Sequence, residues 1–207
     1  MAKLRLGVLA SGRGSNLQAI IDNIAAGKLD AEVKVVICDK STAFALERAK
    51  NQGIKGIFID PKGYSEKSEY EAAIVECLKE SRVELVVLAG YMRLVGETLL
   101  NEFPHRIMNI HPALLPSFPG TQGHRDALEY GVRFSGCTVH FVDDGMDTGP
   151  VILQAVVPVM PDDDEDSLAA RILSEEHKLY SQAIQLYAEK KLRVEGRRVK
   201  IRRYVNE

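Results

Sequence analysis

Cysteine and long apolar runs are both scarce in this sequence. The three cysteines, at positions 38, 77 and 137, are widely spaced and form no CxxC pair. This pattern argues against a disulfide framework or a zinc knuckle. No apolar run approaches the ~20 residues that a membrane-spanning helix needs. The first run is short, contains Arg5 and leads directly into glycines, so it predicts a strand rather than a signal peptide. We therefore expect a cytoplasmic protein with no membrane partner.

An excess of charge of one sign is also missing. The chain has 27 basic and 29 acidic residues among 207, a net charge of −2 and a pI near 6.2. Nucleic-acid binders usually carry a marked basic excess, so we expect no nucleic-acid partner. The last segment is basic, and we interpret it as a solvated edge hairpin turning near Gly196; a nucleic-acid-binding tail is the alternative. The length fits one domain.

Short β-rich apolar runs alternate with helical patterns, at the spacing of βαβ units. The run at 84–88 is almost purely apolar, as in strands buried on both faces of a parallel sheet. These patterns predict an α/β fold with a mostly parallel sheet. The predicted strands are 4–10, 32–38, 54–59, 84–88, 107–110, 136–142 and 151–159, and the predicted helices are 16–26, 43–52, 66–81 and 167–190.

A glycine-rich turn follows the first predicted strand. It contains Gly12, Gly14, Ser15 and Asn16. Glycines let backbone amides at a helix N-terminus approach a phosphate, and Ser15 and Asn16 are expected as helix caps. The dinucleotide fingerprint GxGxxG fails because Leu17 stands in the third glycine position, and no P-loop Lys-Ser/Thr pair is present. The turn predicts a phosphate site, with a plain tight turn as the alternative.

Asn109 and His111 stand at the end of the 107–110 strand. Strand alternation puts both side chains on one face, and Pro112 favours an extended conformation at His111. An amide beside an imidazole suits acyl chemistry, in which the amide stabilises an oxyanion and the imidazole handles charge and protons. A purely structural histidine is the alternative. No GxSxG nucleophile and no HExxH-type spacing occurs, so we expect neither a covalent intermediate nor a metal.

Four motifs in order carry a family resemblance: GxGSN at the first turn, LAGYMRL at 88–94, NIHPALLPSFPG at 109–120 and DDGMDTGPVILQ at 143–154. Together they closely resemble the phosphoribosylglycinamide formyltransferases, a branch of the folate-dependent formyltransferase superfamily. The resemblance extends from residue 4 to about residue 190, and the terminal hairpin is its weakest part.

The resemblance implies a Rossmann-like twisted sheet flanked by helices, with a C-terminal β-hairpin, in a single formyltransferase domain over 1–207. It implies a ribonucleotide-phosphate-binding half over about 1–105, a catalytic and folate-binding half over about 106–190, and a basic hairpin tail over 191–207. The implied reaction moves the formyl group of 10-formyltetrahydrofolate to the amine of glycinamide ribonucleotide in purine biosynthesis. It proceeds by direct attack through a tetrahedral intermediate, in a monomer or homodimer.

The same resemblance implies roles for individual residues. Asn109 and a protonated His111 would stabilise the oxyanion, while Asp147 would raise the proton affinity of the imidazole and relay protons through water. The implied ribonucleotide contacts are Gly12, Gly14, Ser15, Asn16 and Glu176. The implied folate contacts are Lys67, Met92, Arg93, Leu94, Val142, Asp143 and Asp144.

The sequence departs from the family at two implied positions. Lys67 stands where arginine is frequent, which removes a bidentate fork. Gln122 stands where many members have histidine, so of that pair only His124 is present.

Three alternatives remain open. Methionyl-tRNA formyltransferase is expected to have a further C-terminal RNA-binding domain and a basic, tryptophan-containing loop, and formyltetrahydrofolate deformylase an N-terminal regulatory domain. A non-catalytic phosphate-binding module would explain the glycine-rich turn but not Asn109, His111 and Asp147 together.

Overall fold

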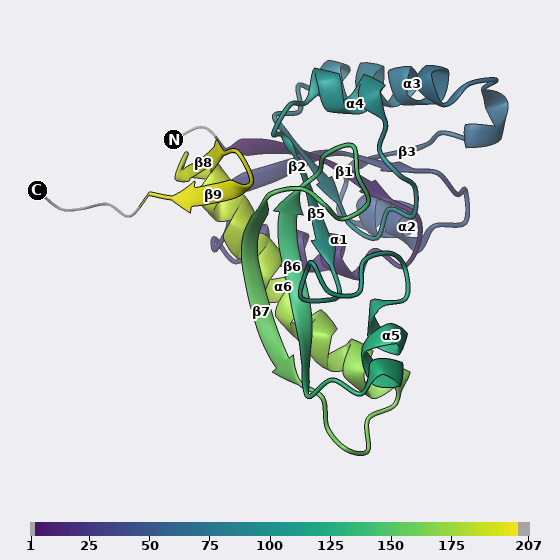
Figure 1. The fold of residues 1–207 in the computed structure, drawn as a ribbon. Coiled ribbons are helices and arrows are strands. Elements are labelled where there is room, and N and C mark those ends of the chain that lie inside the picture. Colours follow the sequence, from purple (N-terminus) through teal and green to yellow (C-terminus); the bar gives the residue numbers. More distant parts are fainter. Residues whose placement is uncertain (1–2, 203–207) are drawn as a thin grey trace, which may run out of the picture.

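The fold is a nine-stranded sheet covered by helices on both faces, seen in a computed structural model that describes residues 3–202 (Figure 1). The strand order is β3-β2-β1-β4-β5-β6-β7-β9-β8. The strands are β1 (Leu4–Ala10), β2 (Ala31–Cys38), β3 (Lys55–Phe58), β4 (Leu85–Leu88), β5 (Ile107–His111), β6 (Phe134–Phe141), β7 (Val151–Pro158), β8 (Leu192–Glu195) and β9 (Arg198–Ile201). The helices are α1 (Ser15–Ala25), α2 (Phe44–Asn51), α3 (Lys67–Glu80), α4 (Glu97–Glu102), α5 (Gly123–Tyr130) and α6 (Glu165–Ala188), with a 3-10 turn η1 (Pro61–Gly63).

The sheet separates two apolar cores because side chains alternate along each strand. In β1, Leu6 and Val8 join the core formed with α1, α2 and α6, whereas Leu9 joins the core formed with α3 and α4. All four residues of β4 are buried, as expected for a strand covered on both faces. The helices therefore form one layer on each side of the sheet.

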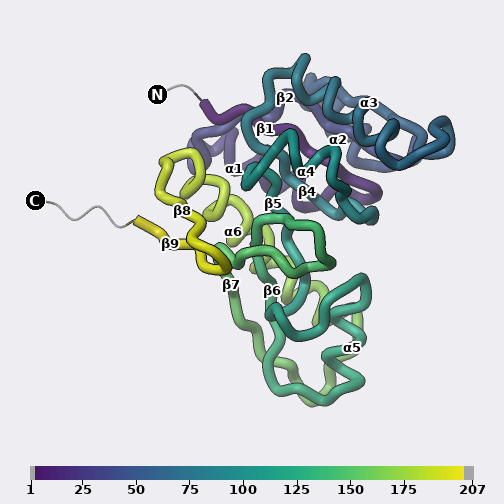
Figure 2. The backbone as a smooth tube through the Cα atoms, turned by 45° about the horizontal axis from the view of Figure 1, so that its top comes forward, coloured from purple at the N-terminus to yellow at the C-terminus, as the bar shows by residue number. Residues whose placement is uncertain are grey.

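The parallel and antiparallel parts of the sheet meet at β5. Strands β1 to β5 pair in parallel, and β6 pairs antiparallel with both β5 and β7. Helix α6 runs along β6 and β7 (Figure 1), and α5 lies at the far end of these strands from the β8–β9 hairpin (Figure 2). In doubly wound sheets, ligands bind outside the carboxyl ends of the strands where the strand order reverses. Here that point lies between β1 and β4, next to the ends of β4 and β5.

The predicted α/β class, the Rossmann-like sheet and the C-terminal hairpin are confirmed. The hairpin turns at Gly196, with φ of 58°, and residues 203–207 of the expected tail lie outside the described residues. One sheet runs through both predicted halves, 1–105 and 106–190. The assignment of phosphate binding to the first half and of catalysis and folate binding to the second stays a prediction.

Three details differ from the expected elements. Helix α4 was not predicted, because it has only six residues and buries only Leu99. Helix α5 was not predicted because it begins at Gly123, at the end of a proline- and glycine-rich segment. Helix α6 begins at Glu165 rather than at 167, because the Asp164 side chain accepts from the Ser167 amide as an N-cap. Among residues 3–202, no helix is long and apolar enough to cross a membrane.

Candidate active site

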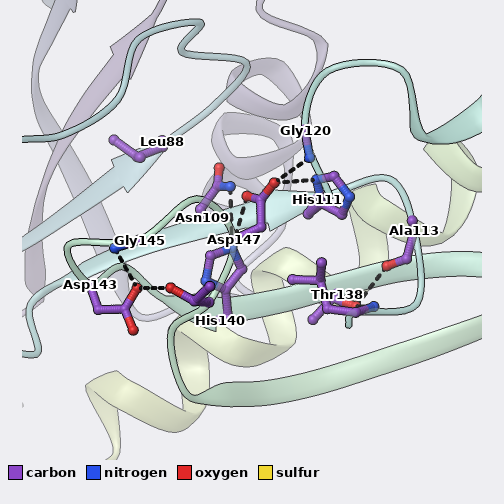
Figure 3. Close-up of polar contacts among 12 residues, drawn as sticks. Leu88, Asn109, His111, Ala113, Gly120, Thr138, His140, Asp143, Gly145 and Asp147 are labelled. Carbon is purple, nitrogen blue, oxygen red and sulfur yellow. Dashed lines mark hydrogen bonds and ion pairs between the residues drawn. The ribbon is translucent and has the colours of Figure 1, made fainter. Parts of the chain in front are cut away.

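The expected catalytic trio assembles at the carboxyl end of β5. Asn109 and His111 lie on this strand, and Asp147 reaches them from the loop between β6 and β7 (Figure 3). Asp147 Oδ2 lies 3.4 Å from His111 Nδ1 and accepts a 2.8 Å hydrogen bond from the Gly120 amide. The side chains of His111 and Asp147 are 3% and 12% exposed, so water screens this contact little. The fold brings together the three residues that the resemblance implied.

Both ring nitrogens of His111 face oxygen atoms. Nε2 lies 2.7 Å from the carbonyl oxygen of Phe118, which can only accept, so Nε2 carries a proton. Nδ1 faces the Asp147 carboxylate, which when ionised also only accepts. The arrangement is fully satisfied when both nitrogens carry protons. These contacts fix the direction of the ring, with Nε2 toward the Phe118 carbonyl and Nδ1 toward Asp147.

His140 is a site residue that the sequence analysis missed. It lies opposite Asn109 in the β5–β6 register, is 2% exposed, and places Nε2 3.7 Å from Asp147 Oδ1. Burial lowers the pKa of His140, while the Phe141 carbonyl and the Asp147 charge oppose this. Strand alternation gives the face of His140 but not its partner across the sheet, so no local signal could identify it.

The neutral ring of His140 fixes the amide of Asn109. His140 Nδ1 lies 2.8 Å from the Phe141 carbonyl and must donate to it, so the neutral Nε2 is an acceptor. Asn109 Nδ2, at 3.3 Å, donates to that nitrogen. One of the two amide protons is thus used, and the other stays available to an oxygen of a substrate.

The loop that carries Asp147 is closely restrained. Asp147 has φ of 55°, a left-handed conformation that non-glycine residues rarely adopt. Asp143 Oδ1 accepts from Thr148 Oγ1 at 2.7 Å and from the Gly145 amide at 3.3 Å, which closes the loop on itself. A Cβ at Gly149 would collide with the Phe141 carbonyl. Backbone strain of this kind persists only where the surroundings impose it.

The glycine-rich turn connects β1 to α1. The expectation that Ser15 and Asn16 cap the helix is wrong: Gly14 is the N-cap, with φ of 67°, and no side chain caps the first turn. Ser15 and Asn16 are already the first two residues of α1. The first-turn N–H groups of α1 therefore remain free of side-chain caps, as an anion site requires.

The two glycines of the turn meet different surroundings. A Cβ at Gly14 would lie 2.9 Å from the Cβ of Ala45, whereas a Cβ at Gly12 would meet no atom within 4 Å. Gly14 is thus required by packing against α2 and by its positive φ. Gly12 leaves open space beside the turn.

Asn16 and Glu176, 160 residues apart, form a buried pair. Asn16 Nδ2 donates to Glu176 Oε2 at 2.8 Å, and Asn16 Oδ1 is buried without a hydrogen-bond partner. Burial raises the pKa of Glu176, and the hydrogen bond from Asn16 only partly opposes this. The expected ribonucleotide contacts therefore lie on one side of the sheet end, with an unused acceptor among them.

The expected folate contacts divide into two groups. Met92 and Leu94 are 57% and 58% exposed, large values for apolar side chains. Arg93 stacks its guanidinium 5.4 Å from the Tyr70 ring centre, and Lys67 Nζ lies 3.8 Å from the buried carboxylate of Glu71.

Glu71, the partner of Lys67, also bonds to the start of α4, because its carboxylate accepts a hydrogen bond from the Gly96 amide. Lys67 is thereby held near the 92–94 segment, although the two are far apart in the sequence.

The second group lies in the loop after β6. Val142 packs against the core on the α3 side, and its amide donates to the Ile107 carbonyl at 2.9 Å. Asp143 uses its carboxylate within the loop, while Asp144 is exposed. Ser11, also missed by sequence analysis, joins the two sides of the site, because its hydroxyl accepts from the Met92 amide at 2.9 Å.

The described residues contain no group of three or more His, Cys, Asp or Glu side chains arranged to hold a metal ion.

Comparisons with known proteins agree with this geometry. The sequence profile described as "Formyl transferase" matches residues 4–184. The chain is 43% identical to a phosphoribosylglycinamide formyltransferase of Bacillus subtilis, over 87% of this chain and 92% of that protein. A glycinamide ribonucleotide transformylase structure from Symbiobacterium toebii matches with a TM-score of 0.95 and 52% identity, covering 97% of this chain and 94% of that one.

A trifunctional purine biosynthetic protein of Drosophila melanogaster is 46% identical over 87% of this chain, which spans only 14% of that protein's length. A formyltetrahydrofolate deformylase structure from Pseudomonas syringae has the same fold, with a TM-score of 0.88, but its sequence is only 25% identical. The match covers 96% of this chain and 66% of the deformylase chain. Identity is thus clearly higher to the transformylases than to the deformylase. The chain belongs to the formyl transferase family, among its phosphoribosylglycinamide formyltransferases.

Proposed function

We propose that this chain transfers the formyl group of 10-formyltetrahydrofolate to the amine of glycinamide ribonucleotide. The observation that carries the proposal is the assembly of Asn109, His111 and Asp147, with Asp147 Oδ2 3.4 Å from His111 Nδ1. An amide donor and an imidazole at the end of one strand, with a carboxylate beside them from a neighbouring loop, can stabilise an oxyanion and move protons. The high identity to named formyltransferases supports the same activity.

The ribonucleotide phosphate is proposed to bind at the turn formed by Gly12, Gly14, Ser15 and Asn16. Uncapped N–H groups and the positive end of the α1 dipole favour an anion there. Glu176 is proposed to accept from the ribose. Glu176 already accepts from Asn16 Nδ2, whereas Asn16 Oδ1 is buried without a hydrogen-bond partner among the described residues. A ribose hydroxyl placed beside this pair would supply the donor that the Asn16 oxygen lacks.

The formyl-folate is proposed to lie against the segment 92–94 and the loop 142–147. Met92 and Leu94 offer exposed apolar surface for a pterin ring, and Arg93 and Lys67 supply positive charge for its acidic end. Asp143 serves mainly to shape the loop, because its carboxylate is engaged there, and Asp144 is free to contact ligand.

In the proposed mechanism, the substrate amine attacks the formyl carbon and a tetrahedral intermediate with an anionic oxygen forms. Asn109 donates its remaining amide proton to that oxygen. His111 stabilises it through its positive charge, and would donate Nε2–H to it only on leaving the Phe118 carbonyl. Asp147 sustains the imidazolium and, through water, takes the amine proton and returns it to the departing folate nitrogen. Neither a metal nor a covalent intermediate is needed.

A coupled assay tests the proposal. Purified chain is mixed with 10-formyltetrahydrofolate, with and without glycinamide ribonucleotide, and both formylated ribonucleotide and formate are quantified. Loss of the formyl group only when ribonucleotide is present is the expected result. Formate release without ribonucleotide would mean a deformylase, and ligand binding without turnover would mean a binding module.

A further inference from the structure

The β8–β9 hairpin is the part of the fold to which the proposed chemistry gives no role. It extends the sheet through β9, which pairs in parallel with β7 at Arg198 and Val151. Val151 is the first residue of β7 and follows directly on the loop that carries Asp147. Figures 1 and 2 show the hairpin beside this end of β7. The hairpin therefore lies next to the catalytic loop, although it comes more than 40 residues later in the sequence.

One side chain of the hairpin bonds directly to that loop. Arg197, next to the turn residue Gly196, donates from Nη2 to the Thr148 carbonyl oxygen at 2.9 Å. Thr148 follows Asp147, and its own hydroxyl is engaged with Asp143. The bond from Arg197 thus restrains the backbone one residue from the catalytic carboxylate.

The hairpin is itself well supported. Leu192, Val194 and Val199 pack against the main core on the α6 side. The Arg202 amide donates to the Lys191 carbonyl at 2.8 Å and closes the base of the hairpin. The guanidinium of Arg197 is therefore carried by a packed element and not by a free tail.

We propose that Arg197 is a positioning residue, through which the C-terminal hairpin sets the place of the Asp147 carboxylate. Asp147 has a left-handed backbone, and the placement of its carboxylate sets the 3.4 Å distance from Oδ2 to His111 Nδ1. A shift of about 1 Å in a catalytic group can lower turnover about 100-fold. The inference rests on the proposed function, since the carboxylate matters only if the trio acts in catalysis.

The test compares Arg197→Ala and Arg197→Lys with Arg198→Ala. Arg198 is adjacent and exposed, and in residues 3–202 its side chain makes no hydrogen bond or ion pair, so it is a matched control. Arg197→Ala should lower kcat roughly 5- to 20-fold, with KM for both substrates within about twofold, because only the placement of a catalytic group changes. Arg197→Lys should recover much of the loss, since an ammonium can also donate to the carbonyl. Arg198→Ala should match the wild type.

A double-mutant cycle separates positioning from general damage. If Arg197 acts through Asp147, Arg197→Ala should add no further loss to Asp147→Asn in single-turnover reactions. Amide exchange at 143–149 should also be faster in Arg197→Ala than in Arg198→Ala. Unchanged kcat in Arg197→Ala, or an equal loss in both backgrounds, would overturn the proposal. Absence of formyl transfer by the wild-type chain would instead refute the proposed function. The amide-exchange measurement would still show whether the hydrogen bond from Arg197 to Thr148 restrains the loop.

Discussion

The amide of Asn109 and the ring of His140 face each other across β5 and β6, with Nδ2 and Nε2 3.3 Å apart. Burial lowers the pKa of His140, and Nδ1 of the neutral ring donates to the Phe141 carbonyl oxygen, which leaves Nε2 as an acceptor. The ring therefore holds the amide with its nitrogen, and not its oxygen, toward Nε2. An oxyanion would be repelled by the amide oxygen. His140 is therefore a positioning residue for Asn109.

Replacing His140 with alanine should lower turnover roughly 10- to 100-fold, since Asn109 loses the acceptor that fixes its orientation. KM for both substrates should stay within a few-fold. Steady-state kinetics of His140→Ala beside the wild type measures this. Turnover within twofold of the wild type would mean that the amide is oriented by other contacts.

Asn109→Ala removes the donor itself. Loss of one oxyanion donor typically lowers kcat by roughly 10²–10³. We expect that loss with little change in folding, because Asn109 is only partly buried and, within residues 3–202, its side chain bonds only to His140. Thermal unfolding serves as the control. A loss below about fivefold would exclude the oxyanion role.

Asp147→Asn should lower turnover by about 10²–10⁴, because the shape is kept but the charge beside His111 is removed. Substrate binding, measured by titration calorimetry, should change only a few-fold. Two neighbouring substitutions provide the comparison. Asp143→Asn keeps an oxygen that can accept from Thr148 and Gly145, and Asp144 is exposed, so both Asp143→Asn and Asp144→Asn should cost far less. Equal losses at all three positions would reject a specific role for Asp147.

The two glycines of the turn should respond differently to substitution. Gly12→Val places its side chain in open space, so it should leave stability unchanged and raise KM for the ribonucleotide, while KM for the folate stays constant. The valine of Gly14→Val must adopt a φ of 67° and fit beside Ala45. This substitution should therefore lower the free energy of unfolding by about 1–3 kcal/mol. Denaturant unfolding and kinetics of both variants test this. A phosphate site elsewhere would leave KM of Gly12→Val unaltered.

Glu176 should make stability depend on pH. Its pKa is raised by burial, so between the usual value of 4.5 and the higher folded value the folded protein binds more protons than the unfolded chain. The contribution of Glu176 is therefore greatest below pH 4.5 and declines as pH rises through the folded pKa. Glu176→Gln should remove this decline. Parallel slopes of unfolding free energy against pH for the two proteins would contradict the assignment.

Most strands and helices and the chemical groups of the site could be predicted from the sequence, whereas the short helices α4 and α5 could not. The apolar runs at 4–10 and 84–88 define strands because their periodicity and composition are local properties. Asn109 and His111 share a strand, so alternation alone placed both on one face. The glycine-rich turn likewise followed from residues within one short segment.

The contacts between groups that are distant in the sequence depend on how the whole fold packs. His140 is paired with Asn109 through the β5–β6 register, and Glu176 reaches Asn16 because α6 packs beside α1. Gly14 is constrained by Ala45, and Arg197 reaches Thr148 through the pairing of β9 with β7. Each contact joins segments separated by about 30 residues or more, and sequence periodicity carries no information about which strand or helix becomes the neighbour. Packing of the two cores and closure of the sheet choose those neighbours, and with them the geometry of the site.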